Sequence, residues 1–558
     1  MESVDLPFDD WLLLAGSPAD TGLHFVGTFD RRITFYSQQV RALRLVHALS
    51  KSDKLKPSDT IAVVGAGAAG VTAALGLALL GNDVTLYDPA TSILQLQSAS
   101  PRLLHPHIYE WPELGSLDDR AGLPFLDWVA GTGGEVCSRL KADFDAANAR
   151  LTNLSFKDSH SLSSVEKVDA RWRLGLSTNA AMDFRQFDHV ILAIGFGNEI
   201  PCGSAKPVHY WKQNSVGSTA AEPLSPATYI VSGNGDGGLT DLLNLLVENF
   251  EHVGFTKQFL DYFSNDTLRA ETESAYAGIS AGGDLEAAFT ARLLPLFTEL
   301  NVIDRIGQML RADRQVTINS LGPLFAAGQA AQLNQVMAFA VLAAATHVDR
   351  PVGRSSGQVT DATGNDGAFQ VAGLSVDGVS LTQTFQHVVL RHGPDRADRY
   401  KPAGSHFETY RTHILELLAA RPELVVPPVL APDTYEFFEV LRMNKLEDHA
   451  SRLASEANAE SAKSTLFLGI DRATRLPVEQ GRQRLLDVAD QCERLASNVS
   501  LHLAASPSTM PAFDDIVRLA RASGGRITLS TLPEWLGAWQ KTAPAIGTAP
   551  SAASPYPC

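Results

Sequence analysis

The feature that most constrains this chain is a glycine-rich turn between two short apolar runs, within residues 60–88. The segment reads TIAVVGAGAAGVTAALGLALLGNDVTLYD. Its pattern predicts a strand, a tight turn, a small-residue helix and a second strand, over residues 61–64, 65–70, 71–80 and 84–87 respectively. A strand–turn–helix–strand unit of this length is typical of a Rossmann-type parallel sheet, so we expect an α/β fold.

The residues of the turn have the properties needed to hold a pyrophosphate. Gly65 permits the tight turn, Gly67 lets the backbone approach a ligand, and Gly70 lets helix and strand pack closely. The helix N-terminus offers unpaired N–H groups and the positive end of its dipole. An acid at the end of the second strand can accept hydrogen bonds from ribose hydroxyls. We therefore predict a dinucleotide site made of Gly65, Ala66, Gly67, Ala68, Ala69, Gly70 and Asp88.

A transmembrane helix is the alternative interpretation, because residues 61–80 carry no charge and reach the length that a bilayer requires. The glycines at the turn, the helix end at Gly81 and the strand that follows argue against it. The N-terminus, MESVDLPFDDW, is acidic where a signal peptide needs a basic region. We expect no membrane segment and a cytoplasmic protein.

Charge and cysteine content narrow the function classes. The chain has 558 residues, with 46 Lys and Arg against 62 Asp and Glu, a net charge of −16. This acidic balance argues against nonspecific binding to nucleic acid or to anionic membranes. No two of the four cysteines are near neighbours, which excludes a CxxC redox pair and a zinc ribbon. We expect no metal site, and redox chemistry would come from a bound cofactor.

A second motif closes the same region at residues 187–201, which read FDHVILAIGFGNEIP. A helix and short alternating strands are predicted before it, at residues 137–148, 153–157 and 165–178. The glycine turn followed by this closing strand resembles the glutathione-reductase-like flavoproteins with two dinucleotide-binding domains. That group includes flavin monooxygenases and N-hydroxylating monooxygenases. The resemblance implies FAD at the first site, next to Ala193 and Gly195, with Ile194 where the family has threonine.

A second glycine turn lies in residues 228–243, TYIVSGNGDGGLTDLL. In the resembled family this position begins the domain that binds NADPH or NADH, which implies a role for Gly233, Gly235 and Gly238. Asp236 would repel a pyrophosphate unless its side chain points away from the turn or caps a helix. Residues 251–263 do not read as a strand ending in an acid or an arginine. The alternative is a turn of the same fold that binds no nicotinamide.

The segment 98–116, SASPRLLHPHIYEWPELGS, combines histidines, prolines and aromatic residues. His105, His107, Tyr109 and Trp111 alternate at period two, so an extended chain would place them on one face. We expect His105, His107 and Trp111 to be catalytic. Arg102 is expected to bind a phosphate of the cofactor. The alternative is a proline-rich loop whose aromatic residues fill a domain interface.

The remaining segments complete the domain prediction. Gly328 and Gln329 are candidates for a loop that closes over the flavin, and residues 433–542 alternate strands with helices, which indicates a small parallel module. The expected organisation begins with an N-terminal extension with an amphipathic helix (residues 1–57) and the FAD-binding domain with a β-meander (58–222). A second Rossmann-like domain with a helical insertion that returns to the FAD domain follows (223–345). The chain then continues with an irregular region and a proline-rich linker (346–432), the C-terminal α/β module (433–542) and a disordered tail (543–558).

Three functions are compatible with these features. The first is an FAD-dependent oxidoreductase, specifically an NAD(P)H-dependent monooxygenase that acts on a small molecule. The second is a flavin oxidase of the amine or amino-acid oxidase type, in which the substrate itself reduces the flavin. The third is a nucleotide-sensing flavoprotein whose C-terminal module binds a protein partner or a second copy of the chain.

Overall fold

The structure is a computed structural model. It describes residues 6–446, apart from 30–32, 53, 114, 180, 196, 198, 207–208, 212–225, 264–266, 366, 425–427 and 429, together with 464–468, 499–503 and 527–530. Contacts divide the chain into two units, Met1–Ala121 with Trp128–Val429, and Gly122–Asp127 with Leu430–Cys558. No described helix is both long and apolar enough to cross a membrane.

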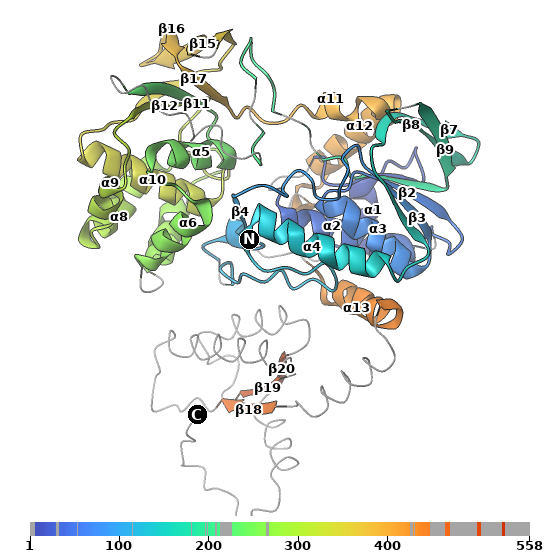
Figure 1. The fold of residues 1–558 in the computed structure, drawn as a ribbon. Coiled ribbons are helices and arrows are strands. Elements are labelled where there is room, and N and C mark those ends of the chain that lie inside the picture. The colour runs from blue at the N-terminus through green and yellow to red at the C-terminus, as the bar shows by residue number, and fades with distance from the viewer. Residues whose placement is uncertain are drawn as a thin grey trace, which may run out of the picture. The chain divides into compact units, whose positions relative to one another are not determined.

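The first sheet of the large unit has five parallel strands and contains the predicted glycine-turn segment (Figure 1). The strand order is β1 (Leu23–Phe25), β10 (His189–Leu192), β2 (Thr60–Val64), β3 (Asp83–Tyr87) and β6 (Leu154–Lys157). The helices of this part are α1 (Phe8–Ala15), α2 (Phe35–Lys51), α3 (Ala68–Leu80) and α4 (Gly133–Asn148). Helix α2 packs on α3, as its amphipathic sequence predicts.

An antiparallel β-meander packs against this sheet, as expected. It consists of β7 (Ser161–Val168), β8 (Arg171–Ser177) and β9 (Met182–Phe187). Trp172 and Leu174 of β8 are fully buried in one cluster with Val190 of the sheet. The same cluster contains Tyr400 and Phe407, from the short helix α11 (Arg396–Tyr400) and from α12 (Gly404–Ala420).

The second sheet begins at the second glycine turn. Its order is β14 (Asp361–Asn365), β15 (Ala368–Val376), β13 (Gly353–Ser356), β12 (Arg314–Ser320), β11 (Ala227–Ser232) and β17 (His387–Leu390), with β16 (Val379–Phe385) paired to β15. Strands β13, β12, β11 and β17 are parallel, and the β14–β15–β16 ladder is antiparallel. The α/β fold class is therefore confirmed, with a parallel sheet following each glycine turn.

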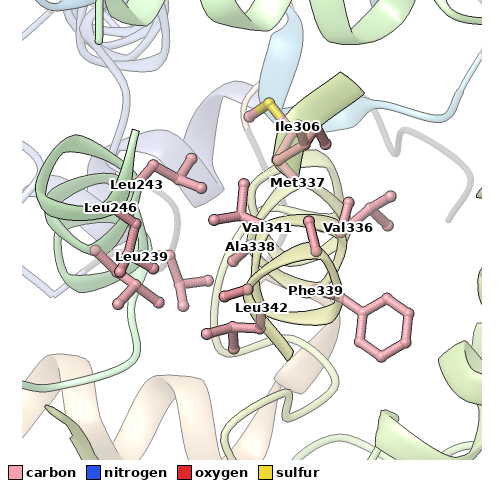
Figure 2. Packing of buried hydrophobic residues seen from close by; sticks show 14 of the residues in the cluster. Leu239, Leu243, Leu246, Ile306, Val336, Met337, Ala338, Phe339, Val341 and Leu342 are labelled. Carbon is pink, nitrogen blue, oxygen red and sulfur yellow. The ribbon is translucent and has the colours of Figure 1, made fainter. Parts of the chain in front are cut away.

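Six helices accompany this sheet within the described residues. They are α5 (Asp236–Leu246), α6 (His252–Asp261), α7 (Thr267–Tyr276), α8 (Glu286–Glu299), α9 (Val302–Gln308) and α10 (Gln332–His347). Figure 2 shows α5 presenting Leu239, Leu243 and Leu246 toward the side chains of α10. Because α10 packs against α5, α8 and α9, it is apolar around most of its circumference.

The chain returns to the first sheet later than expected. We expected the return before residue 345, but β13 to β17 still belong to the second sheet. The return is made by α11 and α12, whose aromatic residues join the core of the first sheet. The sequence of this region gives no glycine motif that marks the crossing, so its position depends on packing partners that are distant in the chain.

The small unit contains α13 (Pro432–Leu446) and a three-stranded parallel sheet. The strands β18 (Ser464–Leu468), β19 (Val499–Leu503) and β20 (Ile527–Ser530) lie in this order, which confirms the predicted parallel arrangement. The helices predicted between these strands, and the tail predicted at 543–558, lie outside the described residues.

His24 of β1 is a buried histidine with a strong expected effect on acid stability. Neither ring nitrogen has a hydrogen-bond partner among the described residues, and the ring stacks on His189 at 6.1 Å. Burial, then the charges of His189 and Lys54, lower the pKa of His24 to about 3. The unfolded chain therefore binds a proton that the folded chain excludes between this pKa and the ordinary 6.5.

We expect the free energy of unfolding to fall as the pH drops through that window, by about 1.4 kcal/mol per pH unit from this ring. Urea denaturation across the window should show a flatter pH dependence for His24→Leu than for the control His347→Leu, which changes an exposed ring. Equal slopes for the two variants would contradict the assignment.

Candidate functional site

The first glycine turn has the shape that a pyrophosphate site requires. Gly65 has φ +103°, and a Cβ there would lie 2.4 Å from the Ala193 carbonyl oxygen. A Cβ on Gly70 would lie 1.7 Å from the Gly65 carbonyl oxygen, so helix α3 approaches the turn as closely as glycine permits. Gly67 differs, because no described atom lies within 4 Å of its Cβ position. The N-terminus of α3 thus opens onto free space where a ligand can approach the backbone.

Asp88 is held beside this turn by two backbone amides. Its Oδ2 accepts from Ala66 N at 2.6 Å and its Oδ1 from Ala90 N at 2.8 Å. The Gly65 amide donates to the Tyr87 carbonyl at 2.8 Å, which fixes the end of β3 against the turn. Carboxylate oxygens have lone pairs beyond those used here, so Asp88 keeps the capacity to accept from a ribose. The open cradle and the oriented acid fit the dinucleotide FAD.

The closing strand ends next to the same turn. Ala193 N donates to the Val64 carbonyl at 2.8 Å, so β10 continues beside β2 up to the turn. Gly195 has φ +76° and open space at its Cβ position. The guanidinium of Arg399 donates to the Ile194 carbonyl at 2.7 Å. The closing motif and the glycine turn thus meet at the carboxyl ends of adjacent parallel strands, where ligands bind in this fold class.

The second turn reproduces the first at each glycine. Gly233 has φ +119°, and a Cβ on Gly238 would lie 1.9 Å from the Gly233 carbonyl oxygen. Gly235 is the N-cap of α5, with φ −74° and ψ −177°, and no described atom lies within 4 Å of its Cβ position. The N-cap of α3, Gly67, has φ −79° and ψ −172°. The two turns therefore offer the same backbone cradle.

Asp236 does not occupy the second cradle. Its Oδ1 accepts from Ala331 N at 2.8 Å and from Asn334 Nδ2 at 2.7 Å, at the start of α10. The carboxylate therefore caps a neighbouring helix, which is one of the two arrangements that would keep it away from a pyrophosphate. The segment after α5 is the helix α6, so the expectation that residues 251–263 are not a strand is confirmed.

Arg102 lies in a buried ion-pair network rather than at an open phosphate position. Its guanidinium pairs with Asp241 of α5, which also accepts from Arg391 Nε at 2.8 Å. The Arg102 guanidinium lies 4.0 Å from the ring centre of Tyr210. All three charged side chains are at least nine-tenths buried. The structure thus corrects the expected phosphate contact. The local sequence sign of this network is Asp241, a carboxylate among the leucines of α5.

The predicted alternation of His105, His107, Tyr109 and Trp111 on one face is wrong. The chain is extended only at β4 (Leu103–Leu104), and it turns into a 3₁₀ helix at Ile108–Glu110. Trp111 is 4% exposed and belongs to the hydrophobic core around the second sheet. The proline-rich pattern suggested an extended chain, but the 3₁₀ turn breaks the period of two.

The two histidines are half-buried and lie in one hydrogen-bonded loop. His107 N donates to His105 Nδ1 at 3.2 Å, and His107 Nε2 lies 3.1 Å from the Arg120 carbonyl oxygen. Burial, then the charge of His107, lower the pKa of His105 to about 4, so its ring is neutral at physiological pH. His105 therefore remains the better candidate for contact with a ligand, because His107 holds the loop together.

Gly328 and Gln329 lie in the turn that precedes α10. Gly328 has φ +79° with open space at its Cβ position, and Gln329 N donates to the Ala326 carbonyl at 3.1 Å. Both residues are exposed. The turn follows β12 of the second sheet, and the prediction that it closes over a flavin stays a prediction.

Comparisons with known proteins cover the segment that contains the first glycine turn. Residues 60–198 match the family described as FAD dependent oxidoreductase (DAO). The match spans the glycine turn, the meander and the closing strand, which are the elements that carry the expected resemblance. This segment is an FAD-dependent oxidoreductase domain, its cofactor is FAD, and the protein is an enzyme.

Several solved structures align with about three fifths of this chain. Bacillithiol disulfide reductase Bdr from Staphylococcus aureus aligns with 62% of this chain and 80% of its own, at 12% identity and a TM-score of 0.36. Kutzneria ornithine N-hydroxylase KtzI aligns over 63% and 85%, at 12% identity and a TM-score of 0.33. Lysine monooxygenase NbtG from Nocardia farcinica aligns over 62% and 82%, at 13% identity and a TM-score of 0.31. The search of curated proteins found no relative. Likeness at this level identifies neither substrate nor reaction.

Proposed function

We propose that this enzyme is an NAD(P)H-dependent monooxygenase that acts on a small molecule, with FAD at the first glycine turn and the nicotinamide dinucleotide at the second. The observation that carries the proposal is the equivalence of the two turns. Gly235 leaves the same open N-terminal cradle on α5 that Gly67 leaves on α3, and the intervening carboxylate of Asp236 is turned away to α10. An open helix N-terminus with unpaired N–H groups suits a phosphate, which supports a dinucleotide at the second turn.

The described cysteines support a reaction in which the reduced flavin does not pass its electrons to a pair of cysteine thiols of the protein. Cys137 and Cys202 are the cysteines in the described part of the chain, and both are buried. Burial raises the pKa of Cys137 to about 12 and also raises that of Cys202, so neither is a reactive thiolate. Bound FAD supplies hydride acceptance and reaction with oxygen. The chain's own turns hold and orient the two dinucleotides.

The position that would contact the second ribose is a serine. Gly233 N donates to the Asn319 carbonyl, just as Gly65 N donates to the Tyr87 carbonyl. Ser320 follows Asn319 as Asp88 follows Tyr87, so Ser320 has the position at the second turn that Asp88 has at the first. An acid at this position binds the 2′-hydroxyl of NADH and repels the 2′-phosphate of NADPH. Ser320 has no charge, which supports binding of NADPH.

We expect Ser320→Asp to shift the preference from NADPH toward NADH by about tenfold to a hundredfold, because hydrogen bonds and repulsions that involve a charged group have this magnitude. The measurement is kcat/KM for nucleotide oxidation in air with each nucleotide. Ser320→Ala is the matched control and should keep the preference for NADPH. The proposal fails if the wild-type enzyme oxidises neither nucleotide, and an unchanged ratio in Ser320→Asp would remove Ser320 from the site.

Substitutions of the two histidines in the 98–116 loop should have different effects, because the two side chains have different roles. We expect His105→Ala to slow turnover by about two orders of magnitude, since loss of a positioned acid or base has effects of this size. His107→Ala should lower Tm instead, because it removes the contact with the Arg120 carbonyl. Because the pKa of His105 is about 4, its ring should add no step to the pH profile of kcat near neutrality. Unchanged turnover in both variants would assign the loop to packing.

A further inference from the structure

The chain passes from the first sheet to the second after β10 and returns after β17, and the two passages lie side by side. Glu199 of the first passage forms an antiparallel bridge with Pro394 of the second. Ile200 N donates to the Gly393 carbonyl at 3.0 Å, and Gly393 N donates to Glu199 Oε2 at 2.7 Å. Paired passages of this kind form a hinge, about which the parts that they join move unless another contact holds them.

A third contact between the two sheets is made by residues 102–111, which we call the bridging segment. Its base belongs to the part of the unit around the first sheet. Strand β4 pairs with β5 (Gly131–Thr132), and Gly133 N at the start of α4 donates to the Arg102 carbonyl at 2.9 Å. Helix α4 packs on α3, whose N-terminus is the first cradle.

The side chains and backbone of the bridging segment contact helices of the second sheet. The Arg102 guanidinium pairs with Asp241 of α5. Leu103 N donates to His252 Nδ1 of α6 at 3.4 Å. Trp111 is buried in the core around the second sheet, and the 3₁₀ turn before it lies against α10. The bridging segment therefore links the helix of the first cradle, through α4, to the helix of the second.

Asp241 joins the bridging segment to the hinge. It is fully buried in α5, the helix whose N-terminus is the second cradle, and it accepts from Arg102 and from Arg391 Nε. Arg391 is part of the return passage, two residues before Gly393 of the hinge. Its backbone forms a wall of the second cradle, because a Cβ on Gly233 would lie 2.1 Å from the Arg391 carbonyl oxygen. One carboxylate of α5 thus binds an arginine from each of two connections between the sheets.

We propose that Arg102 and Asp241 are positioning residues, whose ion pair holds the second cradle in the orientation, relative to the first, that reduction of FAD by NADPH requires. This inference rests on the proposed function. Both residues act through the orientation of the two turns rather than by contact with a cofactor. A displacement of about 1 Å caused far from the reacting atoms can slow a transfer about a hundredfold, so a contact that fixes the two turns has a large effect on the rate.

The test begins with Arg102→Met in the full-length, FAD-loaded protein. This change removes the contact with the bridging segment but leaves Asp241 paired with Arg391, so the protein should fold and retain FAD. Hydrogen exchange of residues 102–111 should become faster by about tenfold or more, since loss of a hydrogen bond between charged groups has at least this effect. Neither of these measurements depends on activity.

The effect on nucleotide should divide between binding and rate. Isothermal titration with NADP⁺ should give the wild-type affinity in Arg102→Met, because the cradle of α5 itself is unchanged. Stopped-flow reduction at saturating NADPH should be about tenfold to a hundredfold slower, because orientation is lost. A residue needed only for stability would not produce this division.

Two further variants separate positioning from stability. Arg102→Lys should recover most of the reduction rate, because Arg102 meets Asp241 through one nitrogen and lysine keeps that charged contact. Arg421→Met is the matched control, since it breaks the pair of Arg421 with Asp10 of α1, which does not involve α5. It should lower Tm and leave the reduction rate at saturating NADPH unchanged.

A wild-type reduction rate in folded Arg102→Met would overturn the proposal, and so would equal slowing in Arg102→Met and Arg421→Met. An Arg102→Lys protein as slow as Arg102→Met would also contradict it. If neither nucleotide reduces the wild-type flavin, the proposed function fails and this inference fails with it. Normal reduction in both the wild-type protein and Arg102→Met refutes this inference alone.

Discussion

Gly67→Val should give a protein that folds but purifies without FAD. The φ of −79° at this position is compatible with valine, and no described atom lies within 4 Å of the Cβ position, so the fold has no reason to change. The branched side chain would fill the space in which the backbone approaches the pyrophosphate. The loss of FAD should therefore be nearly complete.

The measurement is the ratio of visible flavin absorbance to protein absorbance, after purification and after reconstitution with FAD. Gly322→Val is the matched control, since Gly322 has equally open space at its Cβ position and lies outside the first turn. A yellow Gly67→Val protein would contradict the placement of FAD at this turn.

Gly235→Val should give the opposite pattern, in which FAD is retained and its reduction by NADPH is lost. The second turn has the same open N-cap, so the same substitution blocks only the second dinucleotide. We expect the rate of flavin reduction at a fixed NADPH concentration to fall by more than a hundredfold, since the steric block removes both binding and orientation of the nicotinamide.

Stopped-flow mixing under argon measures this rate. Circular dichroism and the flavin spectrum of Gly235→Val should match those of the wild-type protein. Reduction at the wild-type rate would show that the nucleotide, if it binds, does not use the second turn.

The elements around the glycine turns could be predicted because their signals are local. The spacing of Gly65, Gly67 and Gly70, the apolar runs on each side and the acid at position 88 fix a strand–turn–helix–strand unit without reference to the rest of the chain. The meander and the three strands of the C-terminal module follow for the same reason, since alternation and turn residues act over a few positions.

The rest of the site depends on contacts between distant segments. The Asp241 network joins residues from three parts of the chain, and Arg102 looked like a phosphate ligand only because its partner was 139 positions away. Trp111 is an example of the same limit, because its burial against the second sheet cannot be inferred from the neighbouring prolines. A buried acid within an apolar helix is the one local sign that such a network exists.

Anaerobic titration of the wild-type flavoprotein with NADPH and with NADH tests the central claim most directly. The account predicts a yellow protein whose visible flavin band is bleached by NADPH, and more slowly by NADH, in the absence of any other substrate. A flavin band that persists with both nucleotides at millimolar concentration would contradict it.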